Sequence, residues 1–235
     1  MSAIIEEIRH DLISNSDEKT RISGERFFKE SVKLHGLKSS VTITIGKEHY
    51  AKIKGKPKSE ILELCEELWQ SSYMEEAFIA CNWSYYVRKE YVPDDIKVFE
   101  KWISIFVNNW ATCDTLCNHT VGTLIEMFPE KISYLEKWAK LPGRWMKRAS
   151  AVTLIVPARK GLFLKDIFKI AGILLMDKDD MVQKGYGWML KAASQAYQKE
   201  VFDFVIKNKA VMPRTSLRYA IEKMPKELKI MAMAK

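Results

Sequence analysis

Apolar residues recur at every third or fourth position along most of the chain, which is the spacing of amphipathic helices. Ile61, Leu64 and Leu68 form one such stripe, and acidic residues take the opposite face of the same segment. The same spacing predicts further helices over residues 74–87, 94–107, 111–128, 130–140, 143–156, 162–175, 178–196, 199–208 and 214–223. The pattern therefore predicts an all-α protein.

Six of the seven prolines fall between these predicted helices, at positions 93, 129, 142, 157, 213 and 225. Because proline lacks an N–H donor and clashes with the preceding turn, it marks helix boundaries. The connections are short, so neighbouring helices are expected to run antiparallel. Helix pairs that repeat at roughly 35–40 residues predict a curved α-solenoid of HEAT-like antiparallel helix pairs. An irregular helical bundle would give a similar pattern.

Residues 39–58 depart from the helical spacing. Val41 to Ile45 alternate in polarity and are β-branched, and lysines dominate the stretch that follows Gly46. We expect a long basic connection here, with or without a short extended piece, which is either a solvated loop or a loop that touches DNA. Residues 226–235 are expected to be a C-terminal tail, and residues 1–235 to form a single domain.

The chain is basic, and its charge is uneven. It has 235 residues with 38 Lys and Arg against 30 Asp and Glu, a formal net charge of +8. Residues 137–165 hold no acid and the cations Lys137, Lys140, Arg144, Lys147, Arg148, Arg159, Lys160 and Lys165. A second acid-free stretch, 204–221, adds Lys207, Lys209, Arg214 and Arg218. Stacked repeats would gather these cations on a concave face that fits a phosphate backbone, although a solvated face without a ligand is the simpler alternative.

Several classes of function are excluded. The N-terminus has no basic head before an apolar run, and no apolar run approaches the roughly 20 residues that cross a bilayer, so we expect neither a signal peptide nor a membrane partner. Four cysteines suggest reduced, buried thiols of a cytoplasmic protein. Cys113, Cys117 and His119 lack the spacing of a metal site, so we expect no metal and no cofactor. Acidic pairs such as Glu75-Glu76 are interpreted as solvated helix faces.

Asn109-Trp110 and Asp114 form the segment richest in candidate chemistry. Trp110 and Asp114 are four residues apart and therefore share one face near a helix start. A carboxylate beside an indole in a partly dry cleft acts strongly on a nearby cation. The alternative is that Trp110 belongs to the core and Asp114 makes a local cap or pair.

Two more segments combine tryptophan with cations. Arg148 lies four residues after Arg144 and three after Trp145, and an arginine can pair with a phosphate or orient a carboxylate through two parallel hydrogen bonds. In the second segment Gly185 and Gly187 precede Trp188 and Lys191. Each glycine inside a helix costs about 1 kcal/mol relative to alanine, so close packing of the backbone should compensate.

At these three segments the sequence resembles the AlkD-like DNA alkylation repair family of HEAT-like DNA glycosylases. The resemblance extends from about residue 5 to 225 and rests on Asn109-Trp110 with Asp114, Trp145-Met146-Lys147-Arg148-Ala149, and Gly187-Trp188-Met189-Leu190-Lys191. It implies a monofunctional glycosylase that removes positively charged N3- or N7-alkylated purines from duplex DNA. No general acid is needed, because the departing base leaves neutral, while the sugar acquires oxocarbenium character.

The resemblance also implies roles for individual residues. Asp114 would be the catalytic carboxylate, which stabilises the sugar cation and positions water, and Trp110 and Trp188 would be the tryptophans of the cleft. Arg148 would grip the DNA backbone. Together with the charge pattern this gives the further DNA-binding candidates Lys191, Arg144, Lys147, Phe27, Arg159, Lys160, Arg214 and Arg218. We expect the protein to act as a monomer.

The sequence departs from the family at two of these positions. Lys191 stands where the family usually has arginine, which keeps the charge but loses bidentate contact with a phosphate. Phe27 stands where an N-terminal helix usually presents a tyrosine, so it can stack but cannot donate a hydrogen bond. The alternative functions are a catalytically silent HEAT-like DNA-binding or scaffold protein, and a solenoid that binds proteins.

Overall fold

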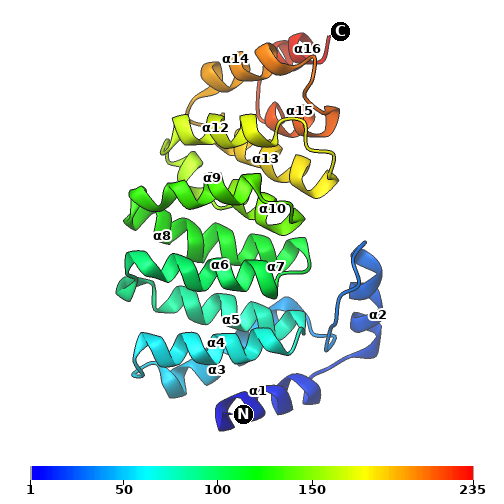
Figure 1. Cartoon of the computed structure of the whole chain (residues 1–235). Coiled ribbons are helices and arrows are strands. Elements are labelled where there is room, and N and C mark those ends of the chain that lie inside the picture. The colour runs from blue at the N-terminus through cyan, green and yellow to red at the C-terminus, as the bar shows by residue number, and fades with distance from the viewer. Residues whose placement is uncertain (1, 235) are drawn as a thin grey trace. The chain divides into compact units, whose positions relative to one another are not determined.

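The computed structural model describes residues 2–234, and these residues form an all-α fold (Figure 1). Within that range the only β-type pairing is an isolated parallel bridge between Lys33 and Tyr73. The chain divides into two compact units, one that ends at Leu116 and one that begins at Cys117. The predicted fold class is therefore confirmed at the level of an all-α chain, while a single domain and a concave basic face stay predictions.

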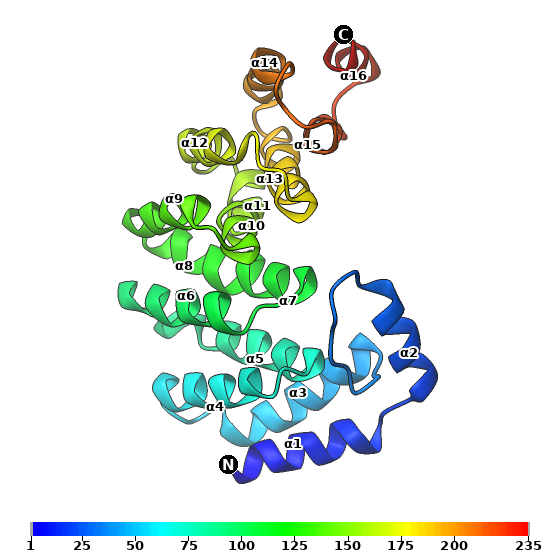
Figure 2. The ribbon, with the colours of Figure 1, turned by 45° about the vertical axis from the view of Figure 1, so that its right-hand side comes forward.

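The first unit is a stack of helices in which α5 is central. α5 packs against α3, α4 and α7, and α1 packs against α3 and α4 (Figure 2). Trp83 and Trp102 are fully buried in its core. Its helices are α1 (Ala3–Ser14), α2 (Glu18–Phe27), α3 (Ser39–Ile53), α4 (Lys58–Gln70), α5 (Met74–Tyr86), α6 (Ile96–Ile105) and α7 (Trp110–Thr115), with 3-10 turns η1 (Arg88–Glu90) and η2 (Pro93–Asp95).

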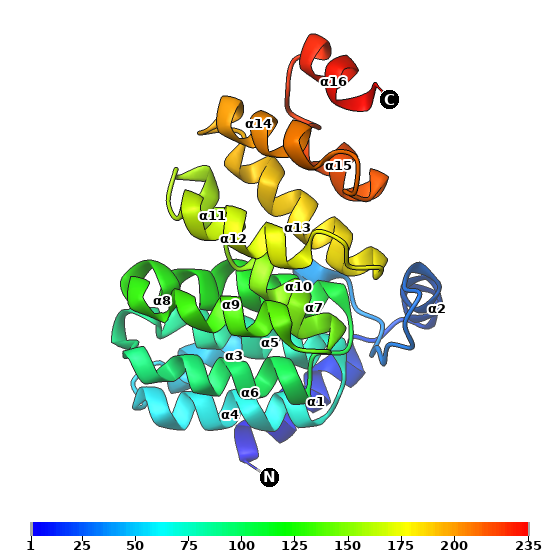
Figure 3. The ribbon, with the colours of Figure 1, turned by 45° about the horizontal axis from the view of Figure 1, so that its top comes forward.

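In the second unit α13 is central, because it packs against α10, α11, α12 and α15 (Figure 3). A π-helical segment, η3 (Leu116–Val121), precedes α8, so the single helix predicted over residues 111–128 is helical as far as Met127 but is not α-helical throughout. The elements are α8 (Gly122–Met127), η4 (Pro129–Lys131), α9 (Ile132–Lys140), α10 (Arg144–Val152), α11 (Ile155–Arg159), α12 (Leu164–Leu174), α13 (Asp180–Ala193), α14 (Gln198–Asn208), α15 (Arg214–Ala220) and α16 (Lys226–Met233).

The expected connection at 39–58 is wrong, because α3 occupies most of it. Thr42, Ile45, His49 and Ile53 recur at helical spacing and are buried. The Trp83 indole N–H donates to the carbonyl of Gly46 at 2.8 Å, where a side chain would crowd Ile79. The β-branched alternation of 41–45 is thus overridden by burial of one helical face.

The expected tail at 226–235 is also wrong, because α16 follows Pro225 and buries Ala232. Lys209 and Arg214 donate to the carbonyls of Met231, Met233 and Ala234 at the end of this helix. Cations at a C-terminus match the helix dipole and the carbonyls that lack intrahelical partners.

Two further predictions, on Pro157 and on the pair Glu75-Glu76, are also wrong. Pro157 lies inside α11 rather than between helices, in the first turn, where the missing N–H has no intrahelical partner to lose. Glu75 and Glu76 are not solvated, since they are 3% and 0% exposed. Arg9 supplies a partner for Glu76 from α1, with Nε donating to Oε2 at 2.9 Å.

Glycine 187 accounts for the close packing of α13 on α15. A β-carbon built there would lie 2.7 Å from Cβ of Tyr219 and 2.9 Å from the carbonyl oxygen of Ser216. Gly172 of α12 is a matched contrast, because a β-carbon there would meet nothing within 4 Å. The expected need for compensation at Gly187 is therefore met by direct contact between two helices.

We expect Gly187→Ala to lower the free energy of unfolding by about 1–3 kcal/mol, because backbone atoms of α15 must move. Gly172→Ala is expected to raise it by about 0.5–1 kcal/mol through helix propensity. Urea unfolding of both variants measures the difference. Equal effects of the two substitutions would contradict the close approach.

Candidate functional site

The start of α7 is fixed by a cap that places Trp110 at the first helical position. Asn109 is 2% exposed, and its Oδ1 accepts from the backbone N–H of Thr112 at 3.0 Å. Its Nδ2 donates to Oδ1 of Asn108 at 2.9 Å. An asparagine cap satisfies one of the orphan N–H groups of the first turn. The backbone of Trp110 therefore has a defined position.

Two phenylalanines pack on the Trp110 indole. Phe28 stacks on it with ring centroids 5.4 Å apart and an interplanar angle of 28°. Phe27 meets it edge-on at 6.0 Å and is 71% exposed. The structure thus brings together Phe27 and Trp110, which the sequence analysis gave as separate candidate site residues. Phe28 was not identified as a site residue, because nothing in the sequence distinguishes it from an ordinary core residue.

Asp114 lies one helical turn after Trp110 on α7 and is 8% exposed. Its neighbours Thr112 and Cys113 are buried as well. A carboxylate withdrawn from bulk water interacts with a nearby positive charge more strongly than one at the surface. Asp114 shares α7 with Trp110, on which both phenylalanine rings pack, and we call these four residues of the first unit the α7 cluster.

Arg148 of α10 is 5% exposed, and its Nη1 donates to the carbonyl of Met181 at 2.5 Å. Gly185 of α13 leaves room for it, because a β-carbon there would lie 3.3 Å from Cγ of Arg148. Gly185, the first glycine of the segment 185–191, thus allows the close approach of a side chain. Little of this arginine is open to a ligand.

Trp188 and Lys191 lie three residues apart on α13, and both are partly exposed. Nζ of Lys191 lies 2.9 Å from Oε2 of Glu222 and 5.4 Å from the ring centroid of Tyr219. Lys191 is therefore paired with a carboxylate from a later segment of the chain.

Three cations of the acid-free stretch 137–165 pair with acids from elsewhere in the chain. Arg144 pairs with Asp179 at 2.6 Å, and Lys147 pairs with Asp177 at 2.7 Å. Lys160 of α11 pairs with Glu126 at 2.7 Å. Asp179 also caps α13 by accepting from the N–H groups of Met181 and Val182. Counting charges along the sequence therefore overstates the positive charge that these residues offer to a ligand.

Arg159 and Arg218 differ from the paired cations. Both are exposed, and for neither does the part of the chain from 2 to 234 supply a hydrogen bond or ion pair. Arg214 is exposed too, but its guanidinium lies 3.4 Å from the carbonyl of Met233. Arg159 and Arg218 are thus the candidate cations with charge available to an outside anion.

The cysteine thiols and the Tyr186 hydroxyl are withdrawn from solvent. All four cysteines are buried, as expected, and none forms a disulfide, while burial raises the pKa of the Cys65 and Cys81 thiols. Burial raises the pKa of Tyr186 to about 12, and its hydroxyl donates to the carbonyl of Leu175. Residues 2–234 contain no cluster of three or more metal-ligand side chains, and no helix there is long and apolar enough to span a bilayer.

Comparison with known proteins gives one family. The family model described as DNA alkylation repair enzyme matches residues 8–224. A solved structure described as a predicted DNA alkylation repair enzyme from Enterococcus faecalis has a TM-score of 0.82 at 13% identity, covering 90% of this chain and 98% of that one. At that identity the likeness shows a shared fold, consistent with an α-solenoid. No curated protein sequence matches significantly.

We expect Asn109→Ala to lower the free energy of unfolding by about 1 kcal/mol, because the Thr112 N–H loses its acceptor. Asn109→Asp should retain most of the stability, since it keeps the accepting oxygen. Urea unfolding of the two variants separates loss of the cap from loss of the amide donor. An alanine variant as stable as the wild type would show that the cap does not fix α7.

Proposed function

The chain belongs to the family of DNA alkylation repair enzymes, and on that premise we propose that it is a DNA glycosylase. Its substrates would be N3- and N7-alkylated purines in duplex DNA, whose N-glycosidic bond it hydrolyses. The observation that carries the proposal is the carboxylate of Asp114, largely withdrawn from water one helical turn from the aromatic rings around Trp110.

The chemistry of the lesion matches this arrangement. A purine alkylated at N3 or N7 carries a positive charge and departs as a neutral base, so protonation of the leaving group is unnecessary. Breaking the bond moves positive charge onto the deoxyribose, as in glycoside hydrolysis. Asp114 would stabilise that charge and orient the attacking water, and its low exposure strengthens the interaction.

The aromatic residues would serve a second purpose, which is to limit access of bulk water. Trp110 is half-buried beneath Phe28 and Phe27, so its indole presents an apolar surface with fixed neighbours. We assign Trp188 of the second unit to the same task on the resemblance alone. Exclusion of water would preserve the effect of a single carboxylate on the sugar cation.

DNA binding would use two kinds of cation. Arg159 and Arg218 are available to phosphates directly. Arg144, Lys147, Lys160 and Lys191 would exchange a carboxylate for a phosphate, and Arg148 and Arg214 already bond to backbone carbonyls. We propose that the enzyme acts as a monomer in the cytoplasm, where its four thiols stay reduced.

A catalytically silent DNA-binding or scaffold protein is the second candidate. Two observations favour it. Lys191 stands where the family usually has arginine, and its ammonium group forms an ion pair with Glu222. Such a protein would bind duplex DNA in a salt-dependent way and release no base.

We expect the wild type to release 7-methylguanine or 3-methyladenine from methylated duplex DNA, and Asp114→Asn to reduce the rate by roughly 10²–10³. The amide keeps the size of the side chain but loses the negative charge. Single-turnover release, followed by chromatography of the free bases, gives the rate.

Asp166→Asn is the matched control, because Asp166 lies in the first turn of α12 outside the α7 cluster, and its rate should equal that of the wild type. If the wild type releases no base, or if Asp114→Asn releases base as fast as Asp166→Asn, the chain is not a glycosylase of this kind.

We expect Arg159→Ala or Arg218→Ala to flatten the slope of log Kd against log salt concentration by about one unit for unmodified duplex DNA. Each variant removes one exposed cation that would release one counterion. Lys199→Ala removes an exposed cation of α14 that pairs with Asp203, and it should leave the slope unchanged. Fluorescence anisotropy over a salt series makes the measurement, and unchanged slopes in all three variants would remove both arginines from the DNA interface.

A further inference from the structure

The helix α2, which ends at Phe27, has no buried residue. Its N-terminus is capped by Asp17, whose Oδ2 accepts from the N–H of Thr20 at 2.7 Å. A helix of 10 residues without a buried face is not stable by itself in water. The position of α2 therefore depends on contacts at its two ends and on the close approach of Gly24 to Leu34, where a β-carbon would lie 2.6 Å from Cδ1.

One end is anchored through Gly36. The Asp17 N–H donates to the carbonyl of Gly36 at 3.0 Å, which joins the start of α2 to the segment that returns toward α3. Gly36 has φ +94°, and a β-carbon there would lie 2.5 Å from the carbonyl oxygen of Asp17. Only glycine adopts this conformation without strain and permits the approach.

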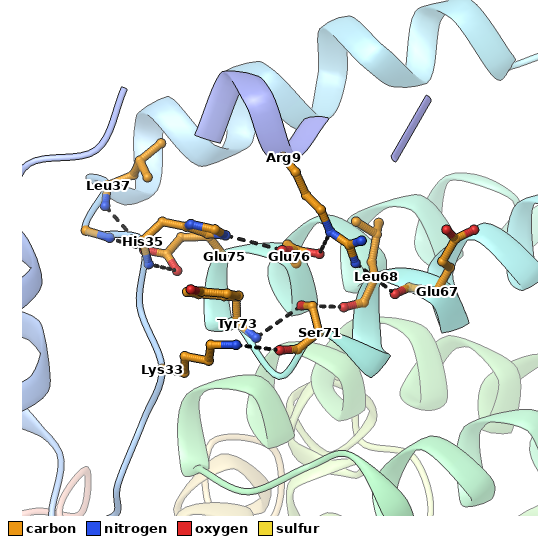
Figure 4. A network of polar contacts seen from close by, with 11 residues as sticks. Arg9, Lys33, His35, Leu37, Glu67, Leu68, Ser71, Tyr73, Glu75 and Glu76 are labelled. Atoms are coloured by element: carbon orange, nitrogen blue, oxygen red, sulfur yellow. Dashed lines mark hydrogen bonds and ion pairs between the residues drawn. The ribbon is translucent and has the colours of Figure 1, made fainter. Parts of the chain in front are cut away.

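The returning segment is held by a buried carboxylate. Glu75, 3% exposed, accepts from three successive backbone N–H groups, those of His35 at 3.0 Å, Gly36 at 2.9 Å and Leu37 at 3.2 Å (Figure 4). The His35 ring stacks on Tyr73 with centroids 3.7 Å apart. Hydrogen bonds to a charged acceptor are stronger than neutral ones. The base of α2 is thus tied to α5.

The other end of α2 leads into the rings at Trp110. Phe28 follows the last residue of the helix and stacks on the indole at 5.4 Å, while Phe27 stands edge-on to Phe28 at 5.5 Å. Offset stacks and edge-on contacts are the favoured geometries of aromatic pairs. The cap at Asn109 fixes the backbone of Trp110, but the rotation of its ring depends on what the ring touches.

We propose that Phe28 is a positioning residue, which holds the indole of Trp110 in its rotamer, and that Glu75 fixes the returning segment to which the start of α2, the helix that leads to Phe28, is bonded. The consequence for catalysis rests on the proposed glycosylase function. Phe28 acts through Trp110 and need not touch DNA. Loss of its ring should therefore slow base release without weakening DNA binding, whereas loss of a DNA contact would weaken binding.

The position of the indole can be tested without activity. In protein labelled with 5-fluorotryptophan, the 19F resonance of Trp110 is the one absent from Trp110→Phe. We expect Phe28→Leu to shift this resonance. Phe28→Tyr, which keeps the aromatic ring, should leave the resonance at its wild-type position. Phe168→Leu, which removes a comparable stack on Phe204 at 5.0 Å in the second unit, should leave it unchanged.

Glu75→Gln keeps one accepting oxygen and loses the charge, so it should shift the same resonance. The control is Glu63→Gln, at an exposed glutamate of α4. An unshifted Trp110 resonance in Glu75→Gln would overturn the role of Glu75.

The consequence for catalysis is measured by single-turnover release of 7-methylguanine at saturating enzyme, together with Kd for unmodified duplex. Phe28→Leu should lower the rate about three- to tenfold, the size expected for one aromatic pair, with Kd unchanged. Phe28→Tyr and Phe168→Leu should match the wild type. The thermal midpoints of Phe28→Leu and Phe168→Leu show whether a general loss of stability accounts for the effect.

A resonance shift without a change in rate, or a slower rate without a shift, would overturn the positioning role. So would rates and resonances that are the same in Phe28→Leu and Phe168→Leu. If the wild type releases no base, the glycosylase proposal fails, while the 19F comparison still decides whether Phe28 holds the indole.

Discussion

Burial of one face of each helix against its neighbours is the interaction on which the rest of the structure depends. The helices of residues 2–234 span 5 to 15 residues, lengths at which an isolated helix is marginal in water. Inward positions are therefore mostly apolar or small, and the buried carboxylates of Glu75 and Glu76 have partners supplied from other segments. Gly187 meets this demand by bringing α13 onto α15, and Gly185 meets it by admitting the side chain of Arg148. The candidate chemistry lies at buried polar groups such as Asp114, whose removal from water is unfavourable unless partners are supplied.

The same demand governs the charges. Acids and bases that are separated along the sequence pair across helices, as Arg144 does with Asp179 and Lys191 with Glu222. A phosphate that approaches these cations must compete with a carboxylate already in place, so part of the Coulomb energy of DNA binding is offset by the ion pair that is lost. Arg159 is exposed and has no ion pair to lose when a phosphate binds. Exposed, unpaired cations are therefore a better guide to a DNA-binding surface than the length of a basic run in the sequence.

Local pattern sufficed for much of this architecture, because helical periodicity and capping are local. The stripe of Ile61, Leu64 and Leu68 is buried as its spacing predicts, and α13 lies within the helix predicted over residues 178–196. The failures have long-range causes. Glu76 reads as a solvated acid, yet its partner Arg9 lies 67 residues away in sequence. Residues 39–58 read as a connection because β-branched residues alternate there, and only packing against α1 and α5 selects the helix.

At the candidate site, the shared helix of Trp110 and Asp114 was predictable from spacing, whereas the stack of Phe28 on Trp110 joins residues 82 positions apart and leaves no mark in either segment.

The aromatic residues at the α7 cluster also bear on how the proposed enzyme would choose its substrate. Phe27 and Phe28 present rings without a donor or acceptor, and Trp110 has one N–H, so this wall offers little hydrogen bonding with which to read a base. A site that discriminates by hydrogen bonds rejects analogues that lack a matching group, and apolar walls cannot do so. On the proposed function, selectivity would therefore come from the lesion itself: alkylation makes the base a leaving group that needs no proton, and a carboxylate such as Asp114 accelerates only those bonds that already break toward a sugar cation.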